Sequence, residues 1–206
     1  MPITVLQHAL SAELVLRLRD KDTGPQDFRA LTRRLSSILA SEAARHLPTR
    51  AASVETPLEP VTGTVLAGEL AVVPVLRAGL GMLEAVLDLL GDATVGYVGM
   101  ERDEETAVAR TYYHKLPGIE GRTVILLDPM LATGGSACRA AGAIYRAGAA
   151  RIILLCIVAA PEGVDRLLRE HPDLQIIAAA YDRELNSKKY ILPGLGDFGD
   201  RLYGTF

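Results

Sequence analysis

Residues 123–136, Thr-Val-Ile-Leu-Leu-Asp-Pro-Met-Leu-Ala-Thr-Gly-Gly-Ser, carry the strongest structural signal in this chain of 206 residues. Residues 124–127 are uninterrupted aliphatics, which is typical of a strand buried on both faces of a parallel sheet. Pro129 disfavours helical geometry at the residue before it, so the strand should end on an extended Asp128. A loop of small residues, 132–136, then opens a helix. The stretch therefore predicts a strand, a turn and a helix of an α/β fold.

The loop at 132–136 has the composition of an anion-binding site. Thr133 and Ser136 offer hydroxyl groups, and the two glycines between them allow successive backbone N–H groups to point inward at a phosphate. The start of the following helix adds free N–H groups and its positive dipole end at the same place. Asp128, an acceptor when ionised, suits the hydroxyl groups of an attached ribose. The alternative is an ordinary strand-to-helix turn, since a Gly-Gly pair alone is common in α/β proteins.

The same alternation of strand and helix extends along most of the chain. Strands are expected over 70–76, 94–99, 123–128, 151–158 and 174–181, and helices over 80–90, 135–147 and 162–170. This pattern predicts an α/β fold in which a central parallel sheet is covered by helices on both faces, with ligands beyond the carboxyl ends of the strands. A helix capped by Asp27 and ending near Pro48, then a hairpin within 50–68, should precede the repeat.

Composition narrows the class of protein. The net charge is −3, from 22 Lys and Arg against 25 Asp and Glu, with no basic block, so no nucleic-acid partner is expected. No stretch has the length of a membrane span and no signal peptide is evident, which predicts a cytoplasmic protein without a membrane partner. Cys138 and Cys156 lack metal-ligand spacing and are expected to be buried free thiols. Residues 1–206 are expected to form one domain.

Residues 194–199, Gly-Leu-Gly-Asp-Phe-Gly, match the dinucleotide fingerprint G-x-G-x-x-G in spelling only. The few residues after Gly199 cannot supply the helix and second strand that give that motif its mechanism. The run 190–201 is so interrupted by glycine and proline that we expect a rigid irregular loop. Such a loop can present backbone groups to the edge of a flat heterocycle. The alternative is a tail packed for stability, with Asp197 as a turn residue.

Two arginines are further candidates for anion binding. Arg77 ends an apolar strand, where its fork of donors needs an anionic partner such as a diphosphate. An ion pair with Glu84 is the alternative. Arg102 belongs to the charged segment 101–106, which is either a solvated turn or a mobile arm that closes over a diphosphate and sheds water.

Three of these segments resemble one family. Asp-Pro-Met-Leu-Ala-Thr-Gly-Gly-Ser, 128–136, resembles the phosphoribosyl pyrophosphate (PRPP) motif of type I phosphoribosyltransferases, in the variant found in uracil phosphoribosyltransferases. Val-Val-Pro-Val-Leu-Arg-Ala-Gly-Leu-Gly-Met, 72–82, resembles the diphosphate-contacting loop of the same enzymes, and 190–201 resembles their uracil-recognition segment. The resemblance covers nearly the whole chain.

This resemblance implies the Rossmann-like type I phosphoribosyltransferase fold, with a hood built from about 1–50 and 182–206 and a flexible β-hairpin loop. It implies transfer of the 5-phosphoribosyl group from PRPP to N1 of uracil, giving UMP and diphosphate in pyrimidine salvage. It also implies Mg²⁺ carried by PRPP without a direct protein ligand, GTP as an effector, and a homodimer or homotetramer.

The resemblance assigns roles to individual residues as well. Those implied to bind PRPP are Arg77, Arg102, Asp128, Pro129, Met130, Leu131, Ala132, Thr133, Gly134, Gly135, Ser136 and Asp197. Those implied to bind uracil are Ile191, Gly196, Asp197 and Phe198. Arg77 would hold the leaving diphosphate, and Asp197 is a candidate catalytic carboxylate that acts through metal-bound water. Glu101, Lys189 and Phe198 depart from the tyrosine, glycine and alanine that are common in relatives.

Two alternatives remain from the sequence. One is a regulator that keeps the fold, senses uracil or UMP and binds RNA, against which the acidic balance argues. The other is a phosphoribosyltransferase for a purine base, which the Asp128-Pro129 pair and the C-terminal loop disfavour.

Overall fold

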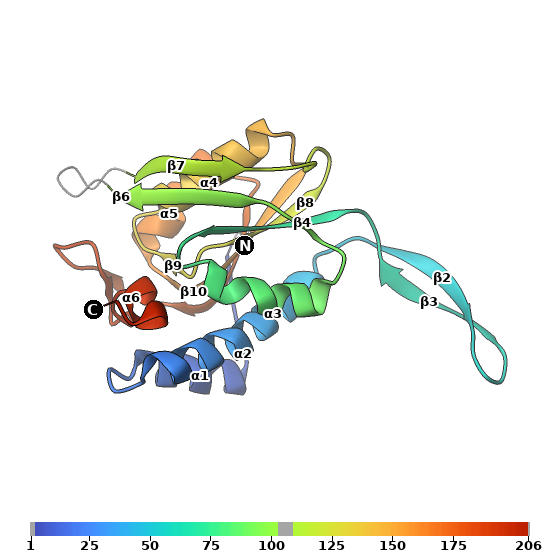
Figure 1. Cartoon of the computed structure of the whole chain (residues 1–206), viewed down its shortest axis with the longest axis horizontal. Helices are drawn as coiled ribbons and strands as arrows, with labels where there is room; N and C mark the ends of the chain where they lie inside the picture. The colour runs from blue at the N-terminus through green and yellow to red at the C-terminus, as the bar shows by residue number, and fades with distance from the viewer. Residues whose placement is uncertain (1–2, 103–108, 206) are drawn as a thin grey trace.

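A computed structural model gives the fold for residues 3–102 and 109–205, with side chains described except at 101–102 and 109–112. A central sheet lies between two layers of helices (Figure 1). Its strands are β1 (Ile3–Val5), β4 (Leu70–Leu76), β5 (Thr94–Val95), β6 (Tyr97–Arg102), β7 (Ala109–Lys115), β8 (Thr123–Leu127), β9 (Met130–Leu131), β10 (Arg151–Ala159) and β11 (Gln175–Tyr181). The helices are α1 (Ala9–Arg19), α2 (Pro25–Ala44), α3 (Leu80–Leu90), α4 (Gly135–Arg146), α5 (Pro161–Glu170) and α6 (Phe198–Tyr203). Two small sheets pair β2 (Thr49–Glu55) with β3 (Pro60–Leu66) and β12 (Glu184–Leu185) with β13 (Ile191–Leu192).

The main sheet is parallel except at one edge. Its order is β1-β11-β10-β8-β4-β6-β7, with β5 beside β4 and β9 beside β10, and only the last pair, β6 with β7, is antiparallel within the described residues. In the middle of the sheet Ile125 of β8 lies opposite Val72 on one side and Ile153 on the other. The predicted α/β fold is confirmed. The turn between β6 and β7, residues 103–108, lies outside the described residues.

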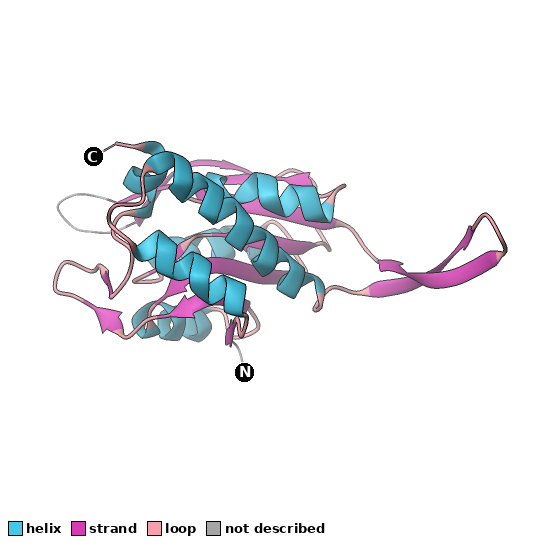
Figure 2. Cartoon of the chain, turned by 90° about the horizontal axis from the view of Figure 1, so that it is seen from below, coloured by secondary structure: helices cyan, strands magenta, loops and turns pink. Residues whose placement is uncertain are grey.

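Side chains of β8 alternate between two hydrophobic cores. Ile125 and Leu127 pack with the layer formed by α1, α2 and α3, which Figure 2 shows in front of the sheet. Val124 and Leu126 pack with α4 and α5 on the opposite face. All four side chains are fully buried. This is why the segment reads as an unbroken aliphatic run rather than as an alternating one.

The chain changes direction across the sheet between β4 and β8. After β4 it forms α3 on one face and continues to β6, whereas β8 lies on the other side of β4 and leads into α4 on the opposite face. The loops after β4 and β8 therefore diverge, and a crevice opens between the carboxyl ends of these two strands. Open α/β sheets bind their ligands at such a switch point.

Two expectations about local structure were wrong. Helix α2 begins at Pro25 with Gly24 as its N-cap, whereas Asp27 lies in the first turn, and it ends at Ala44. A proline at the first helical position is preset for the helix, which explains the earlier start. The C-terminal run also contains regular structure, namely β13 and α6. The Asp197 carboxylate makes α6 stable by accepting the Asp200 N–H at 2.9 Å, so this residue is a helix cap.

The predicted hairpin within 50–68 is confirmed by β2 and β3, and it projects far from the rest of the chain (Figures 1 and 2). Cys138 and Cys156 are buried free thiols as expected. Burial raises the pKa of the Cys138 thiol to about 11, so it stays protonated near neutral pH. None of the helices within 3–102 and 109–205 is long and apolar enough to cross a membrane.

Candidate active site

A cavity of about 250 Å³ lies at the carboxyl ends of β4, β6 and β8. Arg77 reaches it from the loop after β4, and Asp128 from the residue after β8. Residues 130–136 form its floor at the start of α4, and Asp197 and Phe198 enter from the start of α6. The fold thus brings together candidates from three distant segments of the sequence at the predicted edge of the sheet.

The turn into α4 is built for close backbone packing. Gly134 has a left-handed φ of 74° and caps the helix, and a Cβ there would stand 2.8 Å from the carbonyl oxygen of Gly163 at the start of α5. The Gly135 N–H has only a long contact of 3.5 Å with Thr133 Oγ1. In the described part of the chain, no hydrogen bond engages the N–H groups of Thr133, Gly134 or Ser136. Unsatisfied donors around a helix N-terminus form a site for an anion.

Asp128 is a buried carboxylate with little compensation. This residue is 9% exposed, and among the described residues its Oδ1 accepts only a long hydrogen bond of 3.5 Å, from the Met130 N–H. Burial raises the pKa of this carboxyl to about 7 and outweighs the hydrogen bond from the Met130 N–H, which acts to lower it. The ionised form would gain from hydroxyl donors or a cation brought into the cavity.

Arg77 is exposed and available to a ligand. No ion pair within the described residues includes its guanidinium, so the alternative pairing with Glu84 is not formed. Its backbone carbonyl accepts the Tyr203 hydroxyl at 3.1 Å, which ties the loop after β4 to the end of α6.

Three of the candidates from the sequence, Pro129, Ile191 and Gly196, do not line this cavity. A fourth, Arg102, has a side chain outside the described residues. Pro129 is buried, and its carbonyl accepts the N–H groups of Ile157 at 2.9 Å and Val158 at 3.0 Å. Ile191 is buried on β13, and Gly196 borders a neighbouring cavity of about 390 Å³ that Asp197 also lines. Arg102 ends β6, and its side chain lies outside the description.

Sequence reasoning missed the apolar wall of the cavity. Val75 and Leu76 of β4, Ala78, and Met100 of β6 contribute to it. The first three lie within two residues of Arg77 in the sequence, so their place follows once that loop is assigned. Nothing local marks Met100, which arrives through the pairing of β6 with β4.

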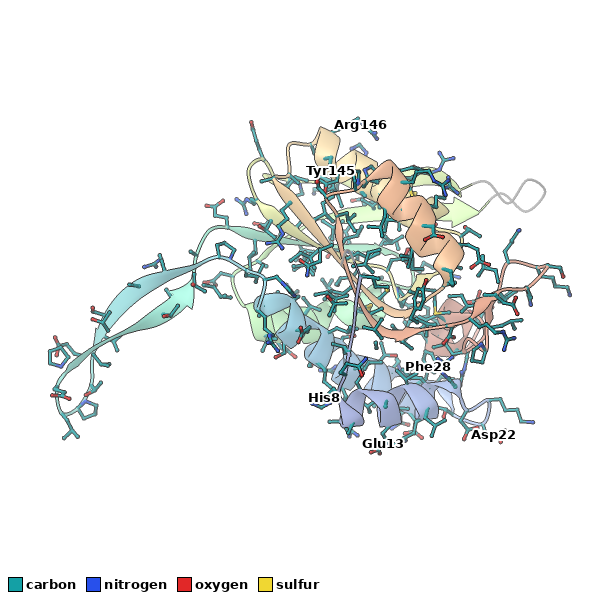
Figure 3. The ribbon with its side chains drawn as sticks, turned by 180° about the vertical axis from the view of Figure 1, so that it is seen from behind. His8, Glu13, Asp22, Phe28, Tyr145 and Arg146 are labelled. Atoms are coloured by element: carbon teal, nitrogen blue, oxygen red, sulfur yellow. The ribbon has the colours of Figure 1, made fainter. Side chains whose placement is uncertain are left out.

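A larger cavity, about 660 Å³, lies on the outer side of α4, bordered by Arg139, Arg146 and His171. Arg146 is labelled in Figure 3 at the end of α4 remote from the turn at Gly134. None of the candidate residues borders this cavity, so size alone does not identify the site.

The donor set in the smaller cavity fits an ion that a ligand carries. Among residues 3–102 and 109–205, no group of three His, Cys, Asp or Glu side chains forms a cage for a metal. Asp128 and Asp197 nevertheless border the same cavity, and carboxylate oxygens are ligands that Mg²⁺ accepts directly or through water.

Comparison with known proteins agrees with this geometry. The model of the family described as uracil phosphoribosyltransferase matches residues 5–205. A uracil phosphoribosyltransferase of Bacillus cereus (strain B4264) is 49% identical over 203 residues, which cover 98% of this chain and 97% of the relative. The chain belongs to the uracil phosphoribosyltransferase family.

Solved structures show the same fold. The AQ2163 protein from Aquifex aeolicus superposes with a TM-score of 0.93 at 37% identity, covering 98% of this chain and 97% of that one. A hypoxanthine phosphoribosyltransferase from Trypanosoma cruzi superposes with a TM-score of 0.51 at 14% identity, covering 76% of each chain. The second likeness shows that this chain shares its fold with that enzyme, and it shows nothing about the base.

Burial of Asp128 predicts a dependence of stability on pH. A carboxyl whose pKa rises from 3.8 to about 7 on folding contributes stability below pH 4 that is lost as the pH rises through 7. Asp128→Asn removes this titration. Relative to that variant, the free energy of unfolding of the unmodified protein should fall by about 4 kcal/mol between pH 4 and pH 8, because nearly the whole shift of the pKa lies inside this pH window.

Urea denaturation at each pH measures this difference. Asp22→Asn, at an exposed loop carboxylate, is the matched control and should track the unmodified protein across the range. A pH-independent difference between Asp128→Asn and the unmodified protein would contradict the assignment.

Proposed function

We propose that this chain transfers the 5-phosphoribosyl group of PRPP to N1 of uracil, releasing UMP and diphosphate. The observation that carries the proposal is the arrangement of unsatisfied N–H groups at 133–136 beside the buried carboxylate of Asp128, in a chain of this family. A phosphomonoester and the ribose attached to it require these two features side by side.

The sugar donor would bind with its 5′-phosphate in the turn at 132–136. There the phosphate meets hydroxyl groups, backbone N–H groups and the positive end of α4. Asp128, the residue directly after β8, lines the same cavity and would accept hydrogen bonds from the ribose hydroxyls. Those donors favour the ionised carboxylate, so binding of PRPP should lower the raised pKa of Asp128.

Arg77 would hold the diphosphate. Its exposed guanidinium is free of carboxylate partners in the described residues and can form paired hydrogen bonds to phosphate oxygens. As the bond from C1′ to the diphosphate breaks, negative charge grows on the departing oxygens, and a fixed cation there lowers the barrier. Arg102, the last residue of β6, would add a second cation.

Uracil would lie against the C-terminal segment, with its N1 facing C1′. Phe198 is buried beside the cavity, and Gly196 and Asp197 precede it with backbone groups that suit the polar edge of the base. Ile191 supports this segment from the core rather than from the cavity wall. Holding N1 and C1′ in contact distance is itself a large part of the rate enhancement.

Mg²⁺ bound to PRPP oxygens would neutralise charge on the leaving diphosphate. The Asp197 carboxylate would meet that ion through water, while its Oδ1 continues to cap α6.

Incubation with labelled PRPP, Mg²⁺ and a panel of uracil, hypoxanthine, guanine and adenine tests the proposal. UMP should form, and no purine nucleotide. Asp128→Asn should lower kcat/KM for PRPP about 100-fold, because a neutral amide accepts hydrogen bonds from the ribose hydroxyls less strongly than an ionised carboxylate does. The variant should remain folded. Product formation is followed by chromatography, and folding by circular dichroism.

Three further arms complete this assay. Asp22→Asn should retain full activity, and unchanged turnover of Asp128→Asn would contradict the assignment. A purine nucleotide as the main product would favour the purine alternative, and RNA binding without UMP formation would favour the regulator. Addition of GTP tests the effector that the family resemblance implies.

The hairpin of β2 and β3 supports a homo-oligomer as the working form. An isolated two-stranded hairpin is marginally stable in water, yet this one projects from the body of the protein (Figure 1). Val54 lies opposite Val61, and the pairing places Val65 on the same face. These three valines are 60%, 48% and 41% exposed. A second copy of the chain packed on this valine face would bury it.

Val61→Asp should therefore weaken the oligomer, because a carboxylate would enter the apolar contact. Thr62→Asp is the matched control, since the neighbouring residue of the same strand faces the other way. Light scattering after gel filtration should show a dimer or tetramer for the unmodified protein and for Thr62→Asp, and a shift toward monomer for Val61→Asp. Equal masses for all three would remove the valine face from the interface.

A further inference from the structure

Asp182 is a buried charge outside the proposed catalytic groups. It follows β11 directly, is 6% exposed, and pairs with Arg19 at the end of α1. The two guanidinium nitrogens of Arg19 donate to the two carboxylate oxygens of Asp182 at 2.8 and 2.6 Å. This is a bidentate pair between residues 163 positions apart.

The pair holds the backbone of one residue from both sides. The Gly194 N–H donates to Asp182 Oδ2 at 2.8 Å, and the Gly194 carbonyl accepts from Arg19 Nη1 at 2.6 Å. Gly194 has a φ of 58°, and a Cβ there would stand 2.2 Å from the Ile191 carbonyl oxygen. The backbone at this point is thus fixed in a conformation that suits glycine and is fastened by two charge-assisted hydrogen bonds.

A second arginine, Arg201, is buried and fastens the next residue. Arg201 Nη1 donates to the Leu195 carbonyl at 2.8 Å and also to the Leu18 carbonyl. Its guanidinium carbon lies 4.6 Å from the centre of the Phe28 ring, which is labelled in Figure 3. Phe28 in turn meets Phe198 edge to face, with ring centroids 5.1 Å apart. Three of the four backbone polar groups of Gly194 and Leu195 are therefore anchored to charged side chains.

We propose that Arg19 and Asp182 are positioning residues for uracil: their ion pair fixes Gly194, and through it sets where Gly196 and Phe198 stand. This inference rests on the proposed function, because it names the base as the ligand of that segment. Neither residue touches the cavity that contains the PRPP turn. Their effect should therefore fall on the base and spare the sugar donor.

The energetics favour positioning over simple stabilisation. The free energy needed to remove a carboxylate and a guanidinium from water offsets most of their electrostatic attraction. A pair of apolar side chains would therefore stabilise the fold at this position equally well. A bidentate pair with two further backbone bonds fixes direction, which an apolar contact does not.

Asp182→Asn tests the proposal. The amide keeps the volume of the side chain but loses the charge that orients Arg19. We expect KM for uracil to rise about tenfold, while KM for PRPP changes less than about twofold. Hydrogen exchange followed by mass spectrometry should show faster exchange in 193–198 and unchanged exchange in 124–131.

Arg19→Lys is the second variant, because lysine keeps the positive charge but cannot form the two parallel hydrogen bonds of the guanidinium. We expect smaller increases in KM for uracil and in the exchange rate of 193–198, again with little change in KM for PRPP. Glu184→Gln is the matched control, since it breaks an exposed ion pair with Arg183 close by in the chain and should change neither KM nor exchange.

Equal changes in both KM values, unchanged exchange in 193–198, or loss of folding in both variants without a selective effect on uracil would overturn the proposal. Failure of the unmodified protein to form UMP would instead refute the proposed function. The exchange measurement still reports on the anchoring of 193–198 in that case, so the two failures are distinguishable.

Discussion

Burial of β8 on both faces is the constraint on which the rest of the molecule depends. Residues 124–127 send alternate side chains into two separate cores, and all are fully buried. A shift of one residue would exchange the two sets, so the register is fixed by packing on both sides. Asp128 must then emerge at the carboxyl edge, and the chain has to turn at once to begin α4. The place of the candidate site is a consequence of core packing.

The same constraint makes the Asp128 carboxylate energetically unfavourable in the protein without ligand. Asp128 is held at the rim of a packed core, where burial raises its pKa to about 7 and no cation of the described residues pairs with it. A protein selected only for stability would place an apolar or amide side chain there. Sites that bind charged ligands often keep such local costs, because the ligand supplies the missing partners.

The sequence was sufficient for features that depend on neighbours in the chain. The aliphatic run 124–127, Pro129 and the small residues at 132–136 predicted a strand, a turn and a helix, and the order of such units predicted the parallel sheet. Local reasoning was wrong for the start of α2, where Pro25 overrode the capping propensity of Asp27. It was also wrong for α6, a short helix among glycines that the Asp197 side chain caps at its start and Gly204 closes at its end.

The two halves of the candidate site differ in how they are held, and this explains which half the sequence could reveal. The turn for the sugar phosphate is positioned by the strand before it and the helix after it, so its determinants are adjacent in the chain. The segment proposed for the base is held by Arg19, which bonds to Gly194 across 175 positions, and by Arg201 reaching Leu18 across 183. No local pattern records such pairings. In 190–201 the sequence shows only glycine and proline residues that interrupt regular structure. In the fold, charged side chains bond to the backbone of this same segment, at Gly194 and Leu195.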